Sequence, residues 1–190
     1  MTDKQALRAE LRTRRKNHEA AIPPSVRGLL FMRPPVPLLE LIPAGATVAI
    51  YDPVAGEASP LGYARWLFEN GHGIALPWFA ARGAPMQFRL WDNPFDEDVL
   101  EPAPYGGRQP SASAELAGID VSIVPLLGFT ERGERLGQGA GHYDRYLADH
   151  PAIVAIGLAW DCQLVETLPI DPHDVPLHAV VTPTRIYGPF

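Results

Sequence analysis

The sequence predicts an α/β fold, and three features carry that prediction. Four apolar runs recur along the chain with the length of strands, at residues 47–51, 74–78, 121–127 and 153–160. Helical patterns lie between several of them, as in the βα units that build a parallel sheet. Alternating glycines follow the third run, where a strand turns into a helix. We therefore expect the 190 residues to form a single domain, a three-layer sandwich with a largely parallel, mixed central sheet and a glycine-rich phosphate loop.

The first segment, residues 2–17, has the pattern of a helix. Thr2 and Gln5 stand three residues apart, which is the spacing of a capping box at a helix start. Residues 19–45 contain repeated prolines, which a long helix does not tolerate. We expect short helical turns and a loop there.

One edge of the first helix is basic. Leu7 and Leu11 form a narrow apolar stripe on it. Lys4, Arg8 and Arg15 lie along the edge of this stripe, with Lys4 and Arg8 one turn apart. A solvated basic face is one interpretation, and a contact with an anion is the other.

The next part of the chain alternates strands and a helix. Residues 47–51 form a strand, and the following helix starts near Ser59 and ends before Gly71. Residues 74–78 form the next strand. Residues 86–91 follow after a short loop instead of a crossover helix, so we expect an antiparallel or edge strand.

The second half contains the expected centre of the sheet. Residues 92–118 are rich in loop formers. The runs 121–127 and 153–160 are continuously apolar, which is typical of central strands covered on both faces. Residues 143–148 form a helix between them.

The glycine-rich stretch, residues 135–145, has the composition of an anion cradle. Its glycines let the backbone approach a ligand, and the helix that opens near Tyr143 points free N–H groups back at the loop. Arg135 offers a charged fork to a phosphate, and Asp144 fits beside phosphates if a magnesium ion lies between them. A tight strand-to-helix turn is the alternative.

Composition excludes several classes of protein. A net charge of −6 argues against a general nucleic-acid binder. The single cysteine, Cys162, excludes an internal disulfide and fits a reducing cytoplasm. No apolar run approaches the roughly 18 residues of a membrane span. We expect a cytoplasmic monomer that binds neither nucleic acid nor membrane.

The flanks of the glycine loop carry a family resemblance. Pro-Leu-Leu-Gly-Phe at residues 125–129 and Arg-Leu-Gly-x-Gly-x-Gly-x-Tyr-Asp-Arg at residues 135–145 resemble the 5-formyltetrahydrofolate cyclo-ligase family, also called methenyltetrahydrofolate synthetases. Lys-x-x-Leu-Arg at residues 4–8 is similar to the family segment that reaches ATP phosphates. The resemblance covers residues 2–17 and about 46–182.

The resemblance implies an enzyme with one α/β domain. Its reaction is the ATP- and Mg²⁺-dependent cyclisation of 5-formyltetrahydrofolate to 5,10-methenyltetrahydrofolate, with release of ADP and phosphate. ATP and Mg²⁺ are the implied cofactors, and the folate and ATP are the implied partners. Two other hypotheses stay open: a non-catalytic nucleotide- or folate-binding homologue, and a related ATP-dependent enzyme that acts on another amide.

The resemblance also assigns roles on the phosphate side of the site. Lys4, Arg8 and Arg135 neutralise phosphate charge and form the catalytic group, and Asp144 holds the metal. The implied ATP contacts are Lys4, Arg8, Arg135, Leu136, Gly137, Gln138, Gly139, Ala140, Gly141, His142 and Tyr143.

The folate side of the site follows the first strand. The resemblance assigns a folate contact to Glu57, with Asp52 as a second candidate, and adds Gln138 and His142 from the loop. From the residues alone, Glu57 is equally well explained as an acid that favours the dipole of the following helix.

Three positions depart from the family pattern. His178 stands where the family commonly has Asp, and imidazole suits a hard magnesium ion less well than a carboxylate. Gln138 replaces a residue that is often aromatic or basic in the family, and His142 replaces one that is often aromatic.

Trp78 or Phe129 can stack on a flat pterin ring, although core packing is the commoner role of such side chains.

Overall fold

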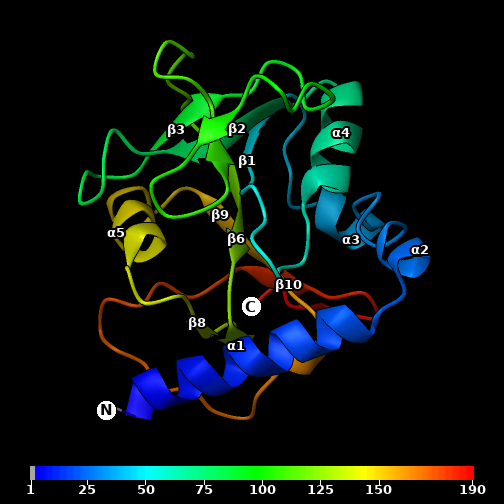
Figure 1. The fold of residues 1–190 in the computed structure, drawn as a ribbon, viewed down its shortest axis with the longest axis vertical. Helices are drawn as coiled ribbons and strands as arrows, with labels where there is room; N and C mark the ends of the chain where they lie inside the picture. Colours follow the sequence, from blue (N-terminus) through cyan, green and yellow to red (C-terminus); the bar gives the residue numbers. More distant parts are fainter. Residues whose placement is uncertain (1–2) are drawn as a thin grey trace.

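A seven-stranded mixed sheet organises the chain (Figure 1). The computed structural model describes residues 3–190. The strand order is β11-β10-β9-β6-β1-β2-β3. Its strands are β1 (Thr47–Ala49), β2 (Gly73–Trp78), β3 (Gln87–Leu90), β6 (Val121–Pro125), β9 (Val154–Leu158), β10 (Ala179–Val181) and β11 (Ile186–Tyr187). The five inner strands are parallel and the two edge strands are antiparallel, which confirms the predicted mixed sheet and the edge position of β3.

Two short ribbons lie outside this sheet. They are β4 (Glu101–Pro102) with β5 (Arg108–Gln109), and β7 (Gly128–Phe129) with β8 (Arg135–Leu136). The β4–β5 hairpin lies within residues 92–118, which the sequence describes only as loop, and strands β10 and β11 were not predicted either. Strands of two or three residues are too short to show a period, so they leave no pattern in the sequence.

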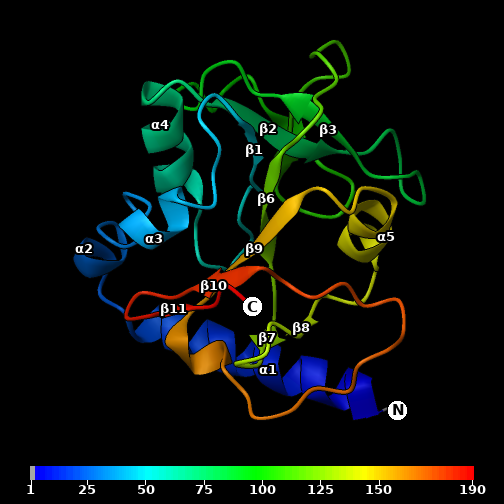
Figure 2. The ribbon, with the colours of Figure 1, turned by 180° about the vertical axis from the view of Figure 1, so that it is seen from behind.

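Helices cover both faces of the sheet (Figures 1 and 2). On one face lie α2 (Pro24–Arg27), α3 (Val36–Leu39) and α4 (Leu61–Glu69), and on the other lies α5 (His142–Asp149). Side chains alternate between the faces, so Val48 packs in the cluster under α4 whereas Ala49 packs in the cluster with Leu147 of α5. Each buried Val, Leu or Ile stabilises the fold by about 1.5–3 kcal/mol. The chain therefore has three layers.

The helix α1 (Asp3–Ala21) crosses the carboxyl ends of the parallel strands. Arg15 of this helix donates to the backbone oxygen of Leu126, just after β6. Arg14 reaches the backbone of Cys162 in the 3₁₀ turn after β9. The apolar stripe predicted on α1 packs this helix against the segments after β6 and in β8. Leu11 is 1% exposed and lies in one cluster with Leu127 and Leu136.

The helix boundaries differ slightly from the predicted ones. α1 continues to Ala21, beyond the predicted end at residue 17, and stops before Pro23. α4 begins at Leu61, with Pro60 and not Ser59 at its N-cap. The predicted Thr2 cap lies outside the described residues. The short helical turns expected between residues 19 and 45 are confirmed as α2 and α3. No helix within residues 3–190 is long and apolar enough to cross a membrane.

Candidate functional site

A cavity of about 590 Å³ lies between α1 and the carboxyl edge of the sheet. This edge is where α/β sheets bind ligands. Segments that are far apart in the sequence meet on its wall. The predicted site residues that line it are Lys4, Arg8, Asp52, Glu57, Arg135, Leu136, Gly137, Gln138, Gly139, Ala140, Gly141, His142, Tyr143 and Asp144. The structure thus brings all of the predicted site residues together.

The glycine loop lies directly against Arg8. The Arg8 side chain donates from Nε to the backbone oxygen of Gly137 at 3.1 Å. Gly139 has a φ of +108°, and a Cβ on it would stand 3.3 Å from the Arg8 guanidinium carbon. Gly141 is the N-cap of α5, so the first N–H groups of that helix open beside the same loop. A side chain at Gly139 would press on the cation that faces the loop.

Arg135 and Asp144 form a largely buried ion pair. Their side chains are 3% and 14% exposed, and Nη2 of Arg135 donates to Oδ1 of Asp144 at 2.5 Å. The same oxygen accepts from the backbone N–H of Val175 at 3.2 Å. Within the described residues, Nε of Arg135 has no hydrogen-bond partner. Burial lowers the pKa of Arg135, and the charge of Asp144 opposes this. The Nε–H of Arg135 is therefore a buried donor without a partner in the described residues.

Lys4 contacts two carboxylates that the sequence analysis missed. Its Nζ lies 2.6 Å from Asp171 and 2.7 Å from Asp174, and both acids line the cavity. Burial opposes the charge of Lys4, but hydrogen bonds to the two acids raise its pKa. Ligand atoms of Asp171, His173 and Asp174 lie within 4.8 Å of one another. The acid-rich spacing of residues 171–174 was the signal available in the sequence.

Glu57 forms a second buried ion pair, with Arg15 of α1. The pair spans 3.2 Å, and its side chains are 7% and 2% exposed, respectively. The other carboxylate oxygen accepts from the backbone N–H of Val54 at 3.1 Å, and Gln138 reaches Glu57 at 3.4 Å. Glu57 is therefore more than a favourable charge at a helix start. The sequence had placed Arg15 only on the basic edge of the helix.

Three rings form an aromatic corner of the cavity, made of Phe79, Tyr105 and His142. Phe79 and Tyr105 are 4.8 Å apart between ring centroids, and His142 lies 4.8 Å from Phe79 and 4.6 Å from Tyr105. All three line the cavity, and each comes from a different segment. Phe79 and Tyr105 were not identified from the sequence, because neither stands in a recognisable motif.

The aromatics considered from the sequence lie elsewhere. The guanidinium carbon of Arg89 lies 4.2 Å from the ring centroid of Trp78, and Phe129 is fully buried against Tyr187. Neither is among the described residues that line the cavity. His178 accepts a hydrogen bond from a backbone N–H of β9 at 3.0 Å and is also outside that lining. Its departure from the family pattern therefore does not change the cavity wall.

His142 is held in one tautomer by Arg145. Nη2 of Arg145 lies 3.1 Å from Nδ1 of His142 and 2.9 Å from the backbone oxygen of Ala140. Arginine only donates, so Nδ1 accepts and the proton of the neutral ring is on Nε2. Burial, and then the charge of Arg145, lower the pKa of His142. The ring therefore faces the cavity in its neutral form.

The fold and the cavity define the class of protein. It is an α/β protein with a cavity of about 590 Å³ at the carboxyl edge of its sheet, walled by arginine and lysine on one side and by aromatic rings on the other. The chain belongs to the 5-formyltetrahydrofolate cyclo-ligase family, whose model matches residues 1–183.

Individual relatives agree with the family assignment. The 5-formyltetrahydrofolate cyclo-ligase of Escherichia coli is 50% identical over 147 residues, which are 74% of this chain and 80% of that one. The 5-formyltetrahydrofolate cyclo-ligase of Mycolicibacterium smegmatis is 36% identical over 148 residues, covering 75% and 76% of the two chains. The structure of Aquifex aeolicus 5,10-methenyltetrahydrofolate synthetase has a TM-score of 0.76 at 24% identity, over 99% of this chain and 93% of that one, and shares the fold.

Proposed function

We propose that the cavity under α1 performs the reaction of the family, the ATP-dependent cyclisation of 5-formyltetrahydrofolate to 5,10-methenyltetrahydrofolate with release of ADP and phosphate. The activity follows from family membership and from the 50% identity to the Escherichia coli enzyme. The observation that supports this location is that all of the residues predicted to bind ATP, folate and metal line one cavity.

The triphosphate of ATP is assigned to the side formed by α1 and the glycine loop. Lys4, Arg8 and Arg135 bring three cations to this side, and the N-terminus of α5 adds backbone N–H donors. The close approach of Gly139 to Arg8 supports this assignment, because a cradle without a Cβ lies beside a guanidinium. These groups would stabilise the charge on the transferring phosphoryl group.

The donors on this side also fit a magnesium ion. Asp144 is the proposed ligand, and the carboxylates of Asp171 and Asp174 line the same cavity, so hard oxygen donors gather near the expected phosphates. A bound Mg²⁺ would neutralise phosphate charge. The protein would supply Asp144 for this from the first turn of α5, where Arg135 and Val175 orient its carboxylate.

The folate is assigned to the opposite side of the cavity. Glu57 offers a carboxylate whose position is set by Arg15 and the Val54 N–H. The aromatic corner of Phe79, Tyr105 and His142 offers apolar ring faces and edges to a flat pterin ring. Nε2 of His142 is a buried nitrogen beside these rings and has no hydrogen-bond partner among the described residues.

The chemistry requires positioning more than a protein nucleophile. The formyl oxygen attacks the γ-phosphorus of ATP, and ADP leaves. The second folate nitrogen then attacks the formyl carbon and loses its proton, and phosphate leaves with the oxygen to complete the methenyl bridge. The cation side and the aromatic corner share one cavity, so the γ-phosphoryl group and the formyl oxygen can meet.

The test combines the protein with ATP, Mg²⁺ and 5-formyltetrahydrofolate and follows the absorbance of the methenyl product. We expect product and ADP in equal amounts. ADP release without cyclisation, or stimulation only by a different amide, would contradict the proposal.

A further inference from the structure

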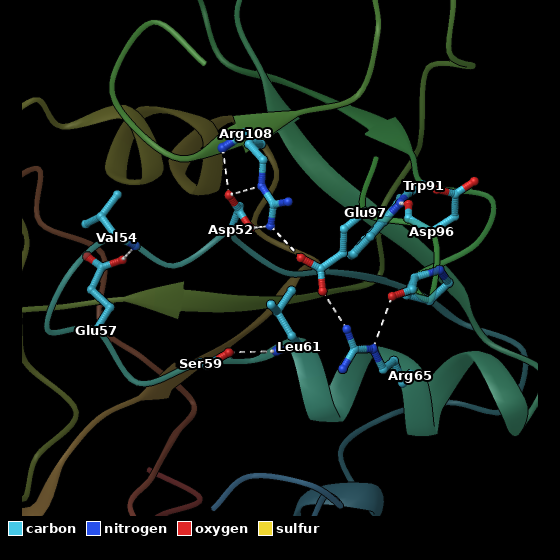
Figure 3. Close-up of polar contacts among 11 residues, drawn as sticks. Asp52, Val54, Glu57, Ser59, Leu61, Arg65, Trp91, Asp96, Glu97 and Arg108 are labelled. Carbon is cyan, nitrogen blue, oxygen red and sulfur yellow. Dashed lines mark hydrogen bonds and ion pairs between the residues drawn. The ribbon is translucent and has the colours of Figure 1, made fainter. Parts of the chain in front are cut away.

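A network of four charged side chains lies beside the folate side of the cavity (Figure 3). Asp52, just after β1, accepts three hydrogen bonds from Arg108: from the backbone N–H at 2.8 Å, from Nε at 3.0 Å and from Nη2 at 2.8 Å. Arg108 also donates to Glu97 at 2.7 Å, and Glu97 accepts from Arg65 of α4 at 2.5 Å. The network thus joins the segment after β1 and helix α4 to β5.

The network carries the hairpin that presents Tyr105. Arg108 opens β5, and its neighbour Gln109 binds both the backbone N–H and the backbone oxygen of Phe79, at 3.1 and 3.2 Å. Tyr105 stands in the turn between β4 and β5, and its hydroxyl accepts from the backbone N–H of Gly83 at 2.7 Å. The hairpin contributes one wall of the aromatic corner, and Arg108 anchors it to the sheet.

The charges in this network cancel. Two carboxylates, Asp52 and Glu97, face two guanidinium groups, Arg65 and Arg108. The Asp52 side chain is only 6% exposed, and both of its oxygens accept from Arg108. Hydrogen bonds to Asp52 and then Glu97 raise the pKa of Arg108. Asp52 and Arg108 both line the cavity, and the two carboxylate oxygens of Asp52 are occupied by Arg108.

We propose that Asp52 and Arg108 are positioning residues that set Tyr105 against His142 and so fix the space available to the flat ring of the folate. This assigns Asp52 an indirect role in place of a direct folate contact, and it rests on the proposed function. The KM for ATP should change little, because the proposed phosphate contacts Lys4, Arg8 and Arg135 make no contact with the network in the described part of the chain.

The test measures steady-state kinetics for Asp52→Asn, Arg108→Ala and the double variant. We expect each single change to raise the KM for 5-formyltetrahydrofolate about tenfold, with kcat and the KM for ATP within about twofold of wild type, and the double variant to equal the single ones because the two residues act as one unit. Arg108→Lys keeps a cation near Asp52 and should recover part of the affinity. Arg185→Ala, which removes an exposed pair with Glu131, is the matched control.

A second measurement does not depend on activity. Amide hydrogen exchange of Gly83 reports whether Tyr105 keeps its place, because the Gly83 N–H donates to the Tyr105 hydroxyl. We expect faster exchange in Asp52→Asn and Arg108→Ala, while the β6 amides stay protected in a folded protein.

The outcomes are distinct. Unchanged Gly83 exchange with unchanged folate KM overturns the positioning role. An effect confined to Arg108→Ala also overturns it, because Arg108 would then touch the substrate itself. Additive effects in the double variant, or a parallel rise in the KM for ATP, overturn it as well. A wild-type protein that cyclises no 5-formyltetrahydrofolate overturns the proposed function instead, and Gly83 exchange then still decides whether the network positions Tyr105.

Discussion

Substitution of Asp144 separates a structural role from a metal role at one position. Its carboxylate is the ion-pair partner of Arg135, whose side chain is 3% exposed. Asp144→Ala leaves that buried guanidinium without its counter-charge, and breaking a buried pair in this way costs about 3–5 kcal/mol. In a chain of this size 1 kcal/mol corresponds to roughly 2–4 °C in Tm, so we expect Tm to fall by about 6–20 °C.

Asp144→Asn keeps an oxygen that can accept from Arg135 and from the Val175 N–H, but it removes the negative charge. We expect a smaller loss of stability, about 1–3 kcal/mol. If Asp144 holds magnesium, the apparent Mg²⁺ requirement rises and turnover falls by more than about tenfold, because ligand charge sets the affinity of a hard-cation site. The assays are thermal unfolding without ATP or Mg²⁺, and cyclisation rate against Mg²⁺ concentration at saturating ATP.

Asp149→Asn, an exposed change at the other end of α5, is the matched control and should leave both curves unchanged. Superimposable Mg²⁺ curves for wild type and Asp144→Asn would refute the metal role. An unchanged Tm for Asp144→Ala would refute the ion-pair reasoning.

Three further predictions address the loop, the basic helix and pH. Gly139→Val forces a branched side chain into a φ of +108° and against Arg8, so we expect loss of ATP binding with the fold largely kept. Gly118→Val, where an added Cβ meets nothing within 4 Å, is the control. Normal ATP affinity in a folded Gly139→Val protein would remove the loop from the site. Lys4→Ala and Arg8→Ala should each weaken ATP binding by about 1–3 kcal/mol in a direct titration, and wild-type affinity in both would favour a basic face with no ligand. Burial and Arg145 hold the pKa of His142 below its ordinary value near 6.5, so its contribution to stability is complete above that pH and is lost as the pH falls through the lowered folded pKa. His142→Phe keeps an aromatic ring but removes the titratable nitrogens, so it should flatten this part of the dependence of Tm on pH. Identical pH profiles for wild type and His142→Phe would mean that the pKa of His142 does not change on unfolding.

The class of fold and the type of chemistry could be predicted from the sequence alone. The apolar runs that became β1, β2, β6 and β9 were recognisable because strand and helix periods are local properties of a chain. The glycine loop was recognisable for the same reason, since alternating glycines before a helix start are a local pattern, and its role as an anion cradle is part of the proposed function. Its flanking motif carried the family resemblance, which the family model confirms.

The pairing of charged side chains could not be predicted in this way, because it depends on the three-dimensional arrangement of the elements. Lys4 contacts Asp171 across 167 positions of sequence, Asp52 contacts Arg108 across 56, and Glu57 contacts Arg15 across 42. These pairs depend on strand order and on α1 crossing the carboxyl edge of the sheet, and no periodic pattern encodes either. The aromatic corner has the same origin. Tyr105 reaches it from a hairpin of two-residue strands, which is attached to the sheet by the Asp52–Arg108 pair and by hydrogen bonds from Gln109 to Phe79.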